Sequence, residues 1–228
     1  MYTFNLLIKR CFDVVSSSIL ALLISPLLLV VALAIKLDSP GPVFFRQQRR
    51  TKGGRIFTML KFRSMVVNAE QMGTGLFNYE NDPRETKVGR FLRRSSIDEL
   101  PQLFNIIKGD MSVVGPRPCV TYELGDFDTL NKRYKKRFEM KAGLTGLAQV
   151  SGRDDISWDV KVGYDNQYVD NFKRIGFIED IRILFLSAVR LFQSGDIYEQ
   201  KADESMTDAE AAKFEEEEII RIAHLPDE

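Results

Sequence analysis

The fold is decided by the stretch VVSSSILALLISPLLLVVALAI at residues 14–35, which contains no charged side chain. A helix of about 20 apolar residues is long enough to cross the hydrocarbon core of a bilayer. Charged side chains flank the stretch on both sides: Lys9, Arg10, Asp13, Lys36 and Asp38. A cleaved signal peptide has a shorter apolar run and a small-residue cleavage site. The sequence therefore predicts a retained segment that associates with a membrane.

Ser25 and Pro26 lie near the centre of this stretch and predict a kink there. Proline has no backbone N–H and its ring clashes with the preceding turn, so a helix that passes through it bends. A spanning helix would place the first residues outside the cell, whereas a re-entrant helix would leave the membrane on the side where it entered. Basic residues at both ends of the stretch favour the re-entrant shape. A buried core helix of a soluble protein is the third alternative.

The overall composition narrows the remaining possibilities. The chain has 228 residues, 44% of them hydrophobic, which is enough for one substantial domain with a small appendage. The 32 basic and 32 acidic residues cancel, so net charge gives no reason to expect a nucleic-acid partner. Cys11 and Cys119 match no metal-binding or redox spacing. His224 is the single histidine, which argues against a Ser-His-Asp triad or a multi-histidine metal site.

Charge is distributed unevenly along the chain. The charged residues between 46 and 63 are all basic, whereas Asp and Glu dominate the residues after 195. A basic stretch beside a membrane segment attracts anionic lipid headgroups and phosphates, although a solvated patch has the same composition. The chain is accordingly divided into a membrane-anchoring segment at 1–39, a catalytic domain at 40–195 and an acidic tail, expected as a short exposed helix, at 196–228.

The local patterns predict an α+β, mainly helical fold in which the kinked re-entrant membrane helix precedes a small hairpin and amphipathic interfacial helices. Residues 43–45 and 56–60 have strand-like composition and flank a Lys-Gly-Gly-Arg turn. A short helix over 87–94 leads to Ser96, which is expected to cap a helix over 97–107.

Two of the predicted helices carry apolar stripes. On the helix over 97–107 the stripe comprises Leu100, Leu103, Phe104 and Ile107. On the helix over 177–192 it comprises Ile178, Ile181, Leu184, Phe185, Ala188, Leu191 and Phe192. An apolar stripe at helical spacing faces either a protein core or the plane of the lipid headgroups, and the pattern does not separate these alternatives.

Asp98 and Glu99 are the leading candidates for chemistry. They are adjacent carboxylates at the start of the helix predicted over 97–107, where the helix dipole stabilises negative charge and would keep a nucleophilic aspartate ionised. A solvated helix start has the same appearance. The pair alone therefore does not decide between catalysis and capping.

Two basic motifs favour catalysis. GPRP at residues 115–118 is a rigid turn that presents one arginine, and KFRSM at 61–65 presents two further cations. Guanidinium groups bind phosphate oxygens through paired hydrogen bonds. Phosphoryl transfer also requires a divalent cation to neutralise charge on the oxygens, and Glu99 is the nearest hard ligand. The sequence predicts phosphate chemistry assisted by Mg²⁺.

The sequence resembles a known family, the bacterial sugar transferases, which are monotopic phosphoglycosyl transferases. Four motifs in order carry the resemblance: KFRSM at 61–65, RRSSIDELPQLFN at 93–105, GDMSVVGPRP at 109–118 and GLTGLAQVSGR at 143–153. The resemblance covers roughly residues 7–192 and includes the Ser25-Pro26 break, which bends a re-entrant helix in that family. The tail after residue 196 lies outside it.

The resemblance implies a role for each matching residue. Asp98 matches the nucleophile that takes up the sugar-phosphate covalently, and Glu99 matches the residue associated with Mg²⁺ and with deprotonating the acceptor. Arg117 matches a phosphate-binding arginine. The remaining matches that are expected to contact substrate are Lys61, Arg63, Arg93, Pro116, Pro118 and Arg153. Asp165 and Tyr168 lie in a later segment of the family, where helix packing is an equal alternative.

The resemblance also implies a function. A sugar-1-phosphate would pass from a UDP-sugar to polyprenyl (undecaprenyl) phosphate, with release of UMP, as the first membrane step of surface glycan synthesis. The site would lie on the cytoplasmic face of the bacterial inner membrane, in contact with membrane lipids. No nucleic-acid partner is expected. The sugar, the glycan and the oligomeric state, a homodimer included, stay open.

Three other functions compete with this one. A non-catalytic membrane scaffold would keep the fold without the activity. A lipid-phosphate phosphatase or nucleotidase would use water to resolve the aspartyl intermediate. A multi-spanning phosphoglycosyl transferase would need many apolar spans, and this chain has one.

Overall fold

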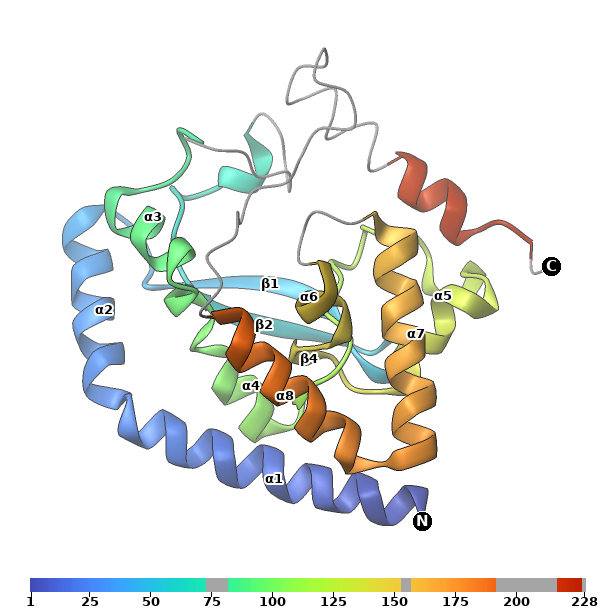
Figure 1. Ribbon diagram of the computed structural model, residues 1–228. Helices are drawn as coiled ribbons and strands as arrows, with labels where there is room; N and C mark the ends of the chain where they lie inside the picture. The colour runs from blue at the N-terminus through green and yellow to red at the C-terminus, as the bar shows by residue number, and fades with distance from the viewer. Residues whose placement is uncertain (73–81, 153–156, 192–216, 227–228) are drawn as a thin grey trace.

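The computed structural model describes residues 1–72, 82–152, 157–191 and 217–226, and it has the mainly helical α+β architecture that the sequence predicts (Figure 1). Helix α1 (Tyr2–Leu23) runs along one side of the molecule, and helix α2 (Ser25–Asp38) turns away from its end. Two small sheets and the later helices form the body that α1 lies against.

The predicted kink is confirmed at the junction of α1 and α2, which are bent by 63°. Pro26 lies in the first turn of α2, where the missing N–H needs no helical partner. The Ser25 hydroxyl donates to the Leu22 carbonyl at 2.8 Å and satisfies one of the carbonyls freed by the break. Among the described residues no single helix is long and apolar enough to cross a membrane, whereas the bent pair together has the required length and composition.

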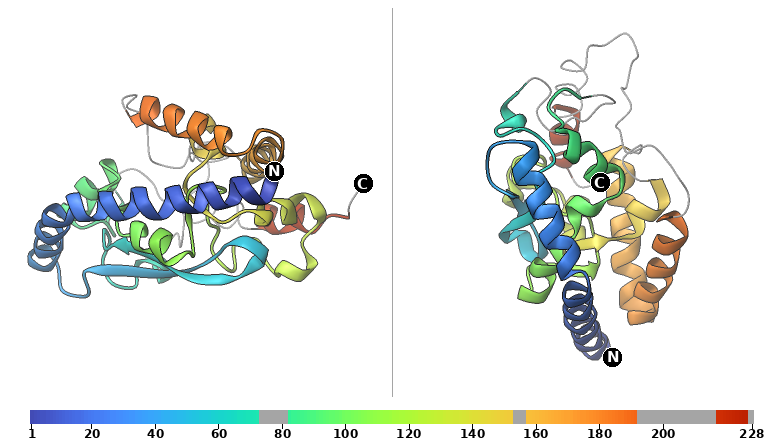
Figure 2. Two further views of the ribbon diagram at one scale, coloured as in Figure 1. Left: turned by 90° about the horizontal axis from the view of Figure 1, so that it is seen from below. Right: turned by 90° about the vertical axis from the view of Figure 1, so that its left-hand side faces the viewer.

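Helix α1 buries polar side chains and exposes apolar ones. Lys9, Asp13 and Ser17 are its buried residues. Its exposed large apolar residues are Phe4, Leu7, Val15, Ile19, Leu20, Leu22 and Leu23. Viewed from below, α1 crosses the body with helix α8 (Phe177–Leu191) on one side and the β1–β2 hairpin on the other (Figure 2). The polar face of α1 is therefore its protein-facing side.

The predicted hairpin is confirmed. Strand β1 (Phe44–Arg50) pairs antiparallel with β2 (Ile56–Phe62), and the turn between them includes the 3₁₀ segment Lys52–Gly54. A second sheet was not predicted. In it the short strand β3 (Ser112–Val114) pairs in parallel with β4 (Gly143–Thr145).

Helix α3 (Lys87–Arg94) is confirmed with the predicted bounds, but the single helix expected over 97–107 is wrong. The chain forms the 3₁₀ turn η3 (Ile97–Glu99), and helix α4 (Gln102–Lys108) begins only afterwards. Pro101 explains the break, because it has no N–H to donate to the carbonyl of Ile97. Ser96 adopts a left-handed conformation and its side chain caps nothing, so the expected N-cap is also wrong.

The apolar stripe expected on this helix is shifted. Phe104 is exposed, and the buried face carries Gln102, Leu103, Asn105 and Ile106. Asn105 explains part of the shift, since its amide donates to the Thr58 carbonyl and accepts from the Leu60 N–H. The side chain thus ties α4 to β2.

The second half of the chain supplies α5 (Lys132–Lys136), the 3₁₀ turn η5 (Arg137–Glu139), α6 (Leu147–Gly152), α7 (Trp158–Ile175) and α8. Ile183 of α8 is buried against Tyr168 and Phe172 of α7. Ile178 and Phe185, from the stripe predicted on this helix, are 68% and 69% exposed. Most of that stripe therefore faces away from the core, and its last residue, Phe192, lies outside the described residues.

Of the acidic tail the structure describes residues 217–226, which contain a short helix as expected, although that helix is not fully exposed. Residues 217–223 are helical and dock on the body, where Ile219 and Ala223 are buried against Leu124, Leu130 and Tyr134. Asn131 donates its backbone N–H to the Ala223 carbonyl at 3.0 Å. The His224 ring lies 3.0 Å from the Leu124 carbonyl oxygen and 3.1 Å from the Thr129 hydroxyl.

The docked helix predicts a contribution of the tail to stability. Ile219→Ala is expected to lower the free energy of unfolding by about 2 kcal/mol, because it leaves a cavity in a buried cluster. Leu225→Ala, in the same segment but 46% exposed where Ile219 is 7% exposed, is the matched control and should change stability less. Thermal unfolding of both purified variants measures the difference, and equal melting temperatures for Ile219→Ala and the wild type would contradict the docking.

Candidate functional site

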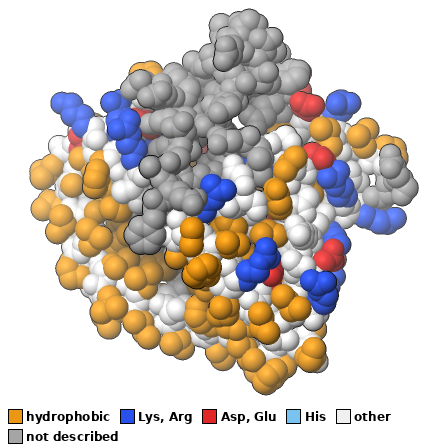
Figure 3. Space-filling model, in the orientation of Figure 1, with side chains coloured by type: hydrophobic (Ala, Val, Ile, Leu, Met, Phe, Trp, Pro, Cys, Tyr) orange, Lys and Arg blue, Asp and Glu red, His pale blue; other side chains and the backbone are white. Residues whose placement is uncertain are grey.

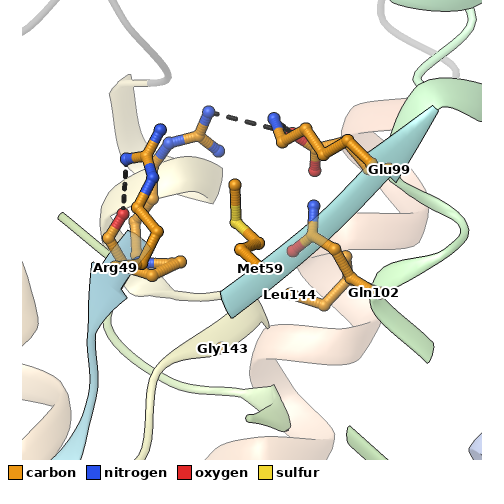
Figure 4. Close-up of a pocket in the computed structure, with 9 residues that line it drawn as sticks. Arg49, Met59, Glu99, Gln102, Gly143 and Leu144 are labelled. Carbon is orange, nitrogen blue, oxygen red and sulfur yellow. Dashed lines mark hydrogen bonds and ion pairs between the residues drawn. The ribbon is translucent and has the colours of Figure 1, made fainter. Parts of the chain in front are cut away.

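A shallow pocket lies where the hairpin, the η3–α4 junction and the β4 strand meet the turn after β3. The side chains and backbone that line it belong to Arg49, Met59, Lys61, Glu99, Gln102, Arg117, Pro118, Gly143 and Leu144. In Figure 4, Arg49 lies on one side and Glu99 with Gln102 on the other, with Met59 between them. The structure thus brings together Lys61, Glu99, Arg117 and Pro118 from three predicted motifs.

Glu99 is held by cations. Lys61 Nζ donates to Glu99 Oε1 at 2.7 Å, and the Arg117 guanidinium lies 3.9 Å from the same oxygen. Burial opposes ionisation of Glu99, but Lys61 and Arg117 outweigh it and lower the pKa of this carboxyl to about 2. Glu99 is therefore ionised at neutral pH.

Asp98 behaves in the opposite way. It is 6% exposed and, although adjacent to Glu99 in the chain, is not among the described residues that line the pocket. Burial raises the pKa of Asp98 to about 6, Lys61 opposes this shift, and the charge of Glu99 adds to it. Burial acts to raise the pKa of both carboxyls; it prevails at Asp98, whereas the charge and hydrogen bond of Lys61, together with Arg117, prevail at Glu99.

The turn that carries Arg117 is held by backbone packing against β4. The Gly143 N–H donates to the Pro116 carbonyl at 2.9 Å, and the Gly115 N–H to the Thr145 carbonyl at 2.9 Å. A Cβ on Gly143 would lie 2.2 Å from the Gly115 nitrogen, so no other residue fits. The close approach of two backbones thus explains Gly115, Gly143 and Gly146 in the motifs at 109–118 and 143–153.

Two cations predicted to contact substrate, Arg63 and Arg93, do not line the pocket, although the charge of Arg93 acts on Asp98. The buried Arg63 guanidinium donates to the Ser39 and Pro40 carbonyls, which places it at the end of α2. Arg93 pairs with the buried Glu85 at 3.1 Å. Arg153 lies outside the described residues.

Asp165 and Tyr168, the candidates from the later segment, are both in the core. Tyr168 donates to Asp180 at 2.9 Å, and Asp165 is paired with Arg137 at 2.8 Å. This placement corresponds to the packing alternative for the helix that carries them.

Arg49, Met59 and Gln102 line the pocket but were not singled out from the sequence. The strand pattern could have indicated Arg49. Side chains alternate between the two faces of a strand, so Arg49 shares the inward face with Gln47. Gln102 follows Pro101 and is buried at the start of α4.

The donor set is too small for a metal site made by the protein alone. Within the described part of the chain, no three His, Cys, Asp or Glu side chains gather around one point. Mg²⁺ commonly uses one or two carboxylates together with substrate phosphates and water. Asp98 and Glu99 fit a Mg²⁺ site that is completed by substrate phosphates and water. They do not fit a site whose ligands all come from the protein.

Comparison with known proteins agrees with this arrangement. The family model described as bacterial sugar transferase matches residues 4–194, which include the hairpin, the adjacent carboxylates and the arginine turn. The chain belongs to the bacterial sugar transferase family. The docked helix at 217–223 lies beyond the part that the family model matches.

Several curated members of the family are similar to this chain. Undecaprenyl-phosphate galactose phosphotransferase of Salmonella typhimurium is 42% identical over 195 residues, which are 79% of this chain and 40% of that protein. UDP-glucose:undecaprenyl-phosphate glucose-1-phosphate transferase of Xanthomonas campestris is 43% identical, covering 76% of this chain and 36% of that one. The chain therefore spans less than half the length of these two relatives. Exopolysaccharide production protein ExoY of Rhizobium meliloti is 42% identical, with 78% and 82% covered.

The raised pKa of Asp98 predicts that this residue destabilises the fold at neutral pH. Between about pH 4 and pH 6 the folded protein binds more protons than the unfolded chain, so stability falls as the pH rises through that window. Asp98→Asn should therefore be more stable than the wild type at pH 7.5, by about 3 kcal/mol at 1.36 kcal/mol per pKa unit, and the gain should vanish near pH 4.

Glu99→Gln is the matched comparison, and its expected effect on stability at pH 7.5 has the opposite sign. Its lowered pKa supplies stability that is present above about pH 4.5 and is lost as the pH falls towards 2, so the variant should be less stable than the wild type at pH 7.5. Chemical unfolding at pH 4 and pH 7.5 measures both effects. An Asp98→Asn variant that is less stable than the wild type at pH 7.5 would contradict the assignment.

Proposed function

We propose that this protein transfers a sugar-1-phosphate from a UDP-sugar to polyprenyl phosphate, giving polyprenyl diphosphate sugar and UMP. The observation that carries the proposal is the contact of Glu99 with Lys61 and Arg117, directly after the buried Asp98. The names of the Salmonella and Xanthomonas relatives specify undecaprenyl phosphate as acceptor and two different hexoses. We propose the same reaction class here, as a first membrane step in surface glycan synthesis.

In the proposed mechanism Asp98 is the nucleophile. One of its carboxylate oxygens forms a bond to the phosphorus that carries the sugar, and the bond from that phosphorus to the UMP oxygen breaks. A phosphate oxygen of the polyprenyl carrier then attacks the same phosphorus and releases the Asp98 carboxylate. Burial favours this role, because a desolvated carboxylate with a pKa of about 6 is ionised at pH 7 but poorly stabilised by water.

Lys61 and Arg117 are the groups proposed to bind the pyrophosphate. Both already lie beside a carboxylate oxygen of Glu99, an anionic group that a phosphate oxygen can replace. Their positive charge would also reduce the repulsion between Asp98 and an anionic substrate. Arg117 is better exposed than Lys61, which suits it for the first contact.

We propose Mg²⁺ as the cofactor. Glu99, with Asp98 beside it, would hold the ion together with oxygens of the substrate. When bound, the ion would neutralise the part of the pyrophosphate's negative charge that Lys61 and Arg117 do not neutralise.

The proposed location is the cytoplasmic face of the bacterial inner membrane, with α1 and α2 as a re-entrant anchor. Apolar side chains exposed on α2 continue those of α1: Leu27, Leu29, Val30, Leu33 and Leu37. Hydrophobic side chains line the margins where α1 and α2 lie and gather again over α8 (Figure 3). Exposed apolar surface of this extent is expected to be covered, and lipid is the cover proposed here.

The reaction predicts a defined product. Protein purified in nanodiscs is incubated with Mg²⁺, undecaprenyl phosphate and a panel that contains UDP-glucose, UDP-galactose and UDP-N-acetylhexosamines. One donor should give a lipid diphosphate sugar and UMP in equal amounts, and Asp98→Asn should lower the rate by more than about a thousandfold. Asp128→Asn, an exposed aspartate on a distant turn, is the control and should retain activity.

Two results would count against the proposal. UMP release without any lipid product would indicate that water resolves the intermediate, as in a phosphatase. A folded protein that is inactive with every donor would favour a scaffold.

The re-entrant anchor makes its own prediction. A cysteine at Thr3, in a Cys11→Ser, Cys119→Ala background, should react with a membrane-impermeant thiol reagent only after cells are permeabilised. Lys52→Cys in the hairpin turn is the matched cytoplasmic control, and both positions are exposed in the protein. Labelling of Thr3→Cys in intact cells, with Lys52→Cys protected, would indicate a spanning helix instead.

A further inference from the structure

Arg137 and Asp165 form an ion pair in the core, outside the pocket. Their charged groups are 2.8 Å apart, and their side chains are 2% and 1% exposed. Burial raises the pKa of Asp165 to about 6, although Arg137 and Lys161 act against this shift. The attraction between the two charges therefore does not offset the cost of removing the Asp165 carboxylate from water. Since apolar residues often stabilise such a position better, stability alone does not account for the pair.

Arg137 also contacts the turn that carries Arg117. Its Nη2 atom donates to the Arg117 carbonyl at 2.5 Å. The next carbonyl, of Pro118, accepts from Arg49 at 2.8 Å, and the preceding one, of Pro116, accepts from Gly143. Three consecutive carbonyls of the turn are thus bound from three separate elements.

Arg117 and Pro118 are the residues of the turn that line the pocket, and the Arg117 side chain is the charged one. Proline on both sides fixes φ at residues 116 and 118. With the carbonyls held, the Arg117 guanidinium reaches to 3.9 Å from Glu99. An Arg117 that must bind a phosphate gains from this restriction, because less conformational freedom is lost on binding.

The orientation of Arg137 is fixed by aromatic rings. Its guanidinium carbon lies 4.9 Å from the centre of the Trp158 ring and 5.6 Å from that of Phe138. Such contacts favour a planar guanidinium over an ammonium group. Carboxylate and carbonyl partners at Nη2, with rings packed against the guanidinium, restrict the orientation of Arg137.

We infer that Arg137, fixed by Asp165, is a positioning residue that orients Arg117 toward the substrate phosphates. The inference rests on the proposed function, because it takes Arg117 as a phosphate-binding group. It assigns Asp165 a role in catalysis without contact to substrate.

The test replaces both partners at once, since removing one would leave an unpaired buried charge. Arg137→Met/Asp165→Leu should fold and should lower kcat/KM for the active UDP-sugar by about tenfold. In an Arg117→Gln background the same replacement should change kcat/KM by less than about twofold, because two residues that act through one group are not additive. Val162→Ala, on α7 and fully buried, controls for loss of packing and should keep its effect in both backgrounds.

A second measurement does not depend on turnover. Hydrogen–deuterium exchange across residues 113–121 of the substrate-free protein should be faster in Arg137→Met/Asp165→Leu than in the wild type, and unchanged in Val162→Ala. A wild type that is inactive with every donor would refute the proposed function, and exchange would then still test whether Arg137 holds the turn. Unchanged exchange, a kcat/KM within about twofold of wild type, or an equal loss in the Arg117→Gln background would overturn the inference.

Discussion

The ion pair between Lys9 and Asp180 is the contact on which the rest of the structure depends. Lys9 Nζ lies 2.5 Å from the Asp180 carboxylate and donates to the Val114 carbonyl at 2.7 Å, so one ammonium group joins α1, α8 and the end of β3. Both side chains are buried, and a buried charge that loses its partner is strongly destabilising. Helix α1 therefore cannot rotate about its axis without a large loss of stability.

This constraint connects the anchor to the chemistry. Val114 directly precedes Gly115, the first residue of the turn that presents Arg117. Asp13, one helical turn after Lys9, accepts from the Ser112 hydroxyl and the Val113 N–H, and so binds the same strand. The outward apolar face of α1 and the pocket are consequently fixed relative to each other through three residues of β3. Under the proposed function, such a link would hold the pocket at one height above the lipid surface.

The parts of the fold that could be predicted from the sequence are those set by neighbouring residues. The break at Pro26, the hairpin around Lys52–Gly54 and helix α3 each follow from local chemistry. The parallel pairing of β3 with β4 and the docking of Ile219 join segments far apart in the chain, and no local pattern specifies such partners.

The same limit applies to the site. Adjacent carboxylates and an arginine between prolines were visible as chemistry, but the sequence could not assign an environment to each cation. Lys61 and Arg63 are two residues apart, yet Lys61 contacts Glu99 whereas Arg63 binds carbonyls at the end of α2. The partner of a long side chain depends on which segment packs nearby, and that is decided by tertiary structure.

The opposite pKa shifts of Asp98 and Glu99 bear on the order in which donor and acceptor bind in the proposed reaction. A carboxylate with a pKa of about 2 is a weak base, so Glu99 as it stands is poorly suited to take a proton from a lipid phosphate. Its low pKa depends on Lys61 and Arg117, the same two cations that a pyrophosphate would attract. A donor pyrophosphate bound to these cations would offset the effect of their charge on Glu99, so in the proposed donor complex the pKa of Glu99 would rise and its carboxylate would become a better base. Donor binding would thereby prepare the site for the acceptor, which is the order that a covalent intermediate on Asp98 requires.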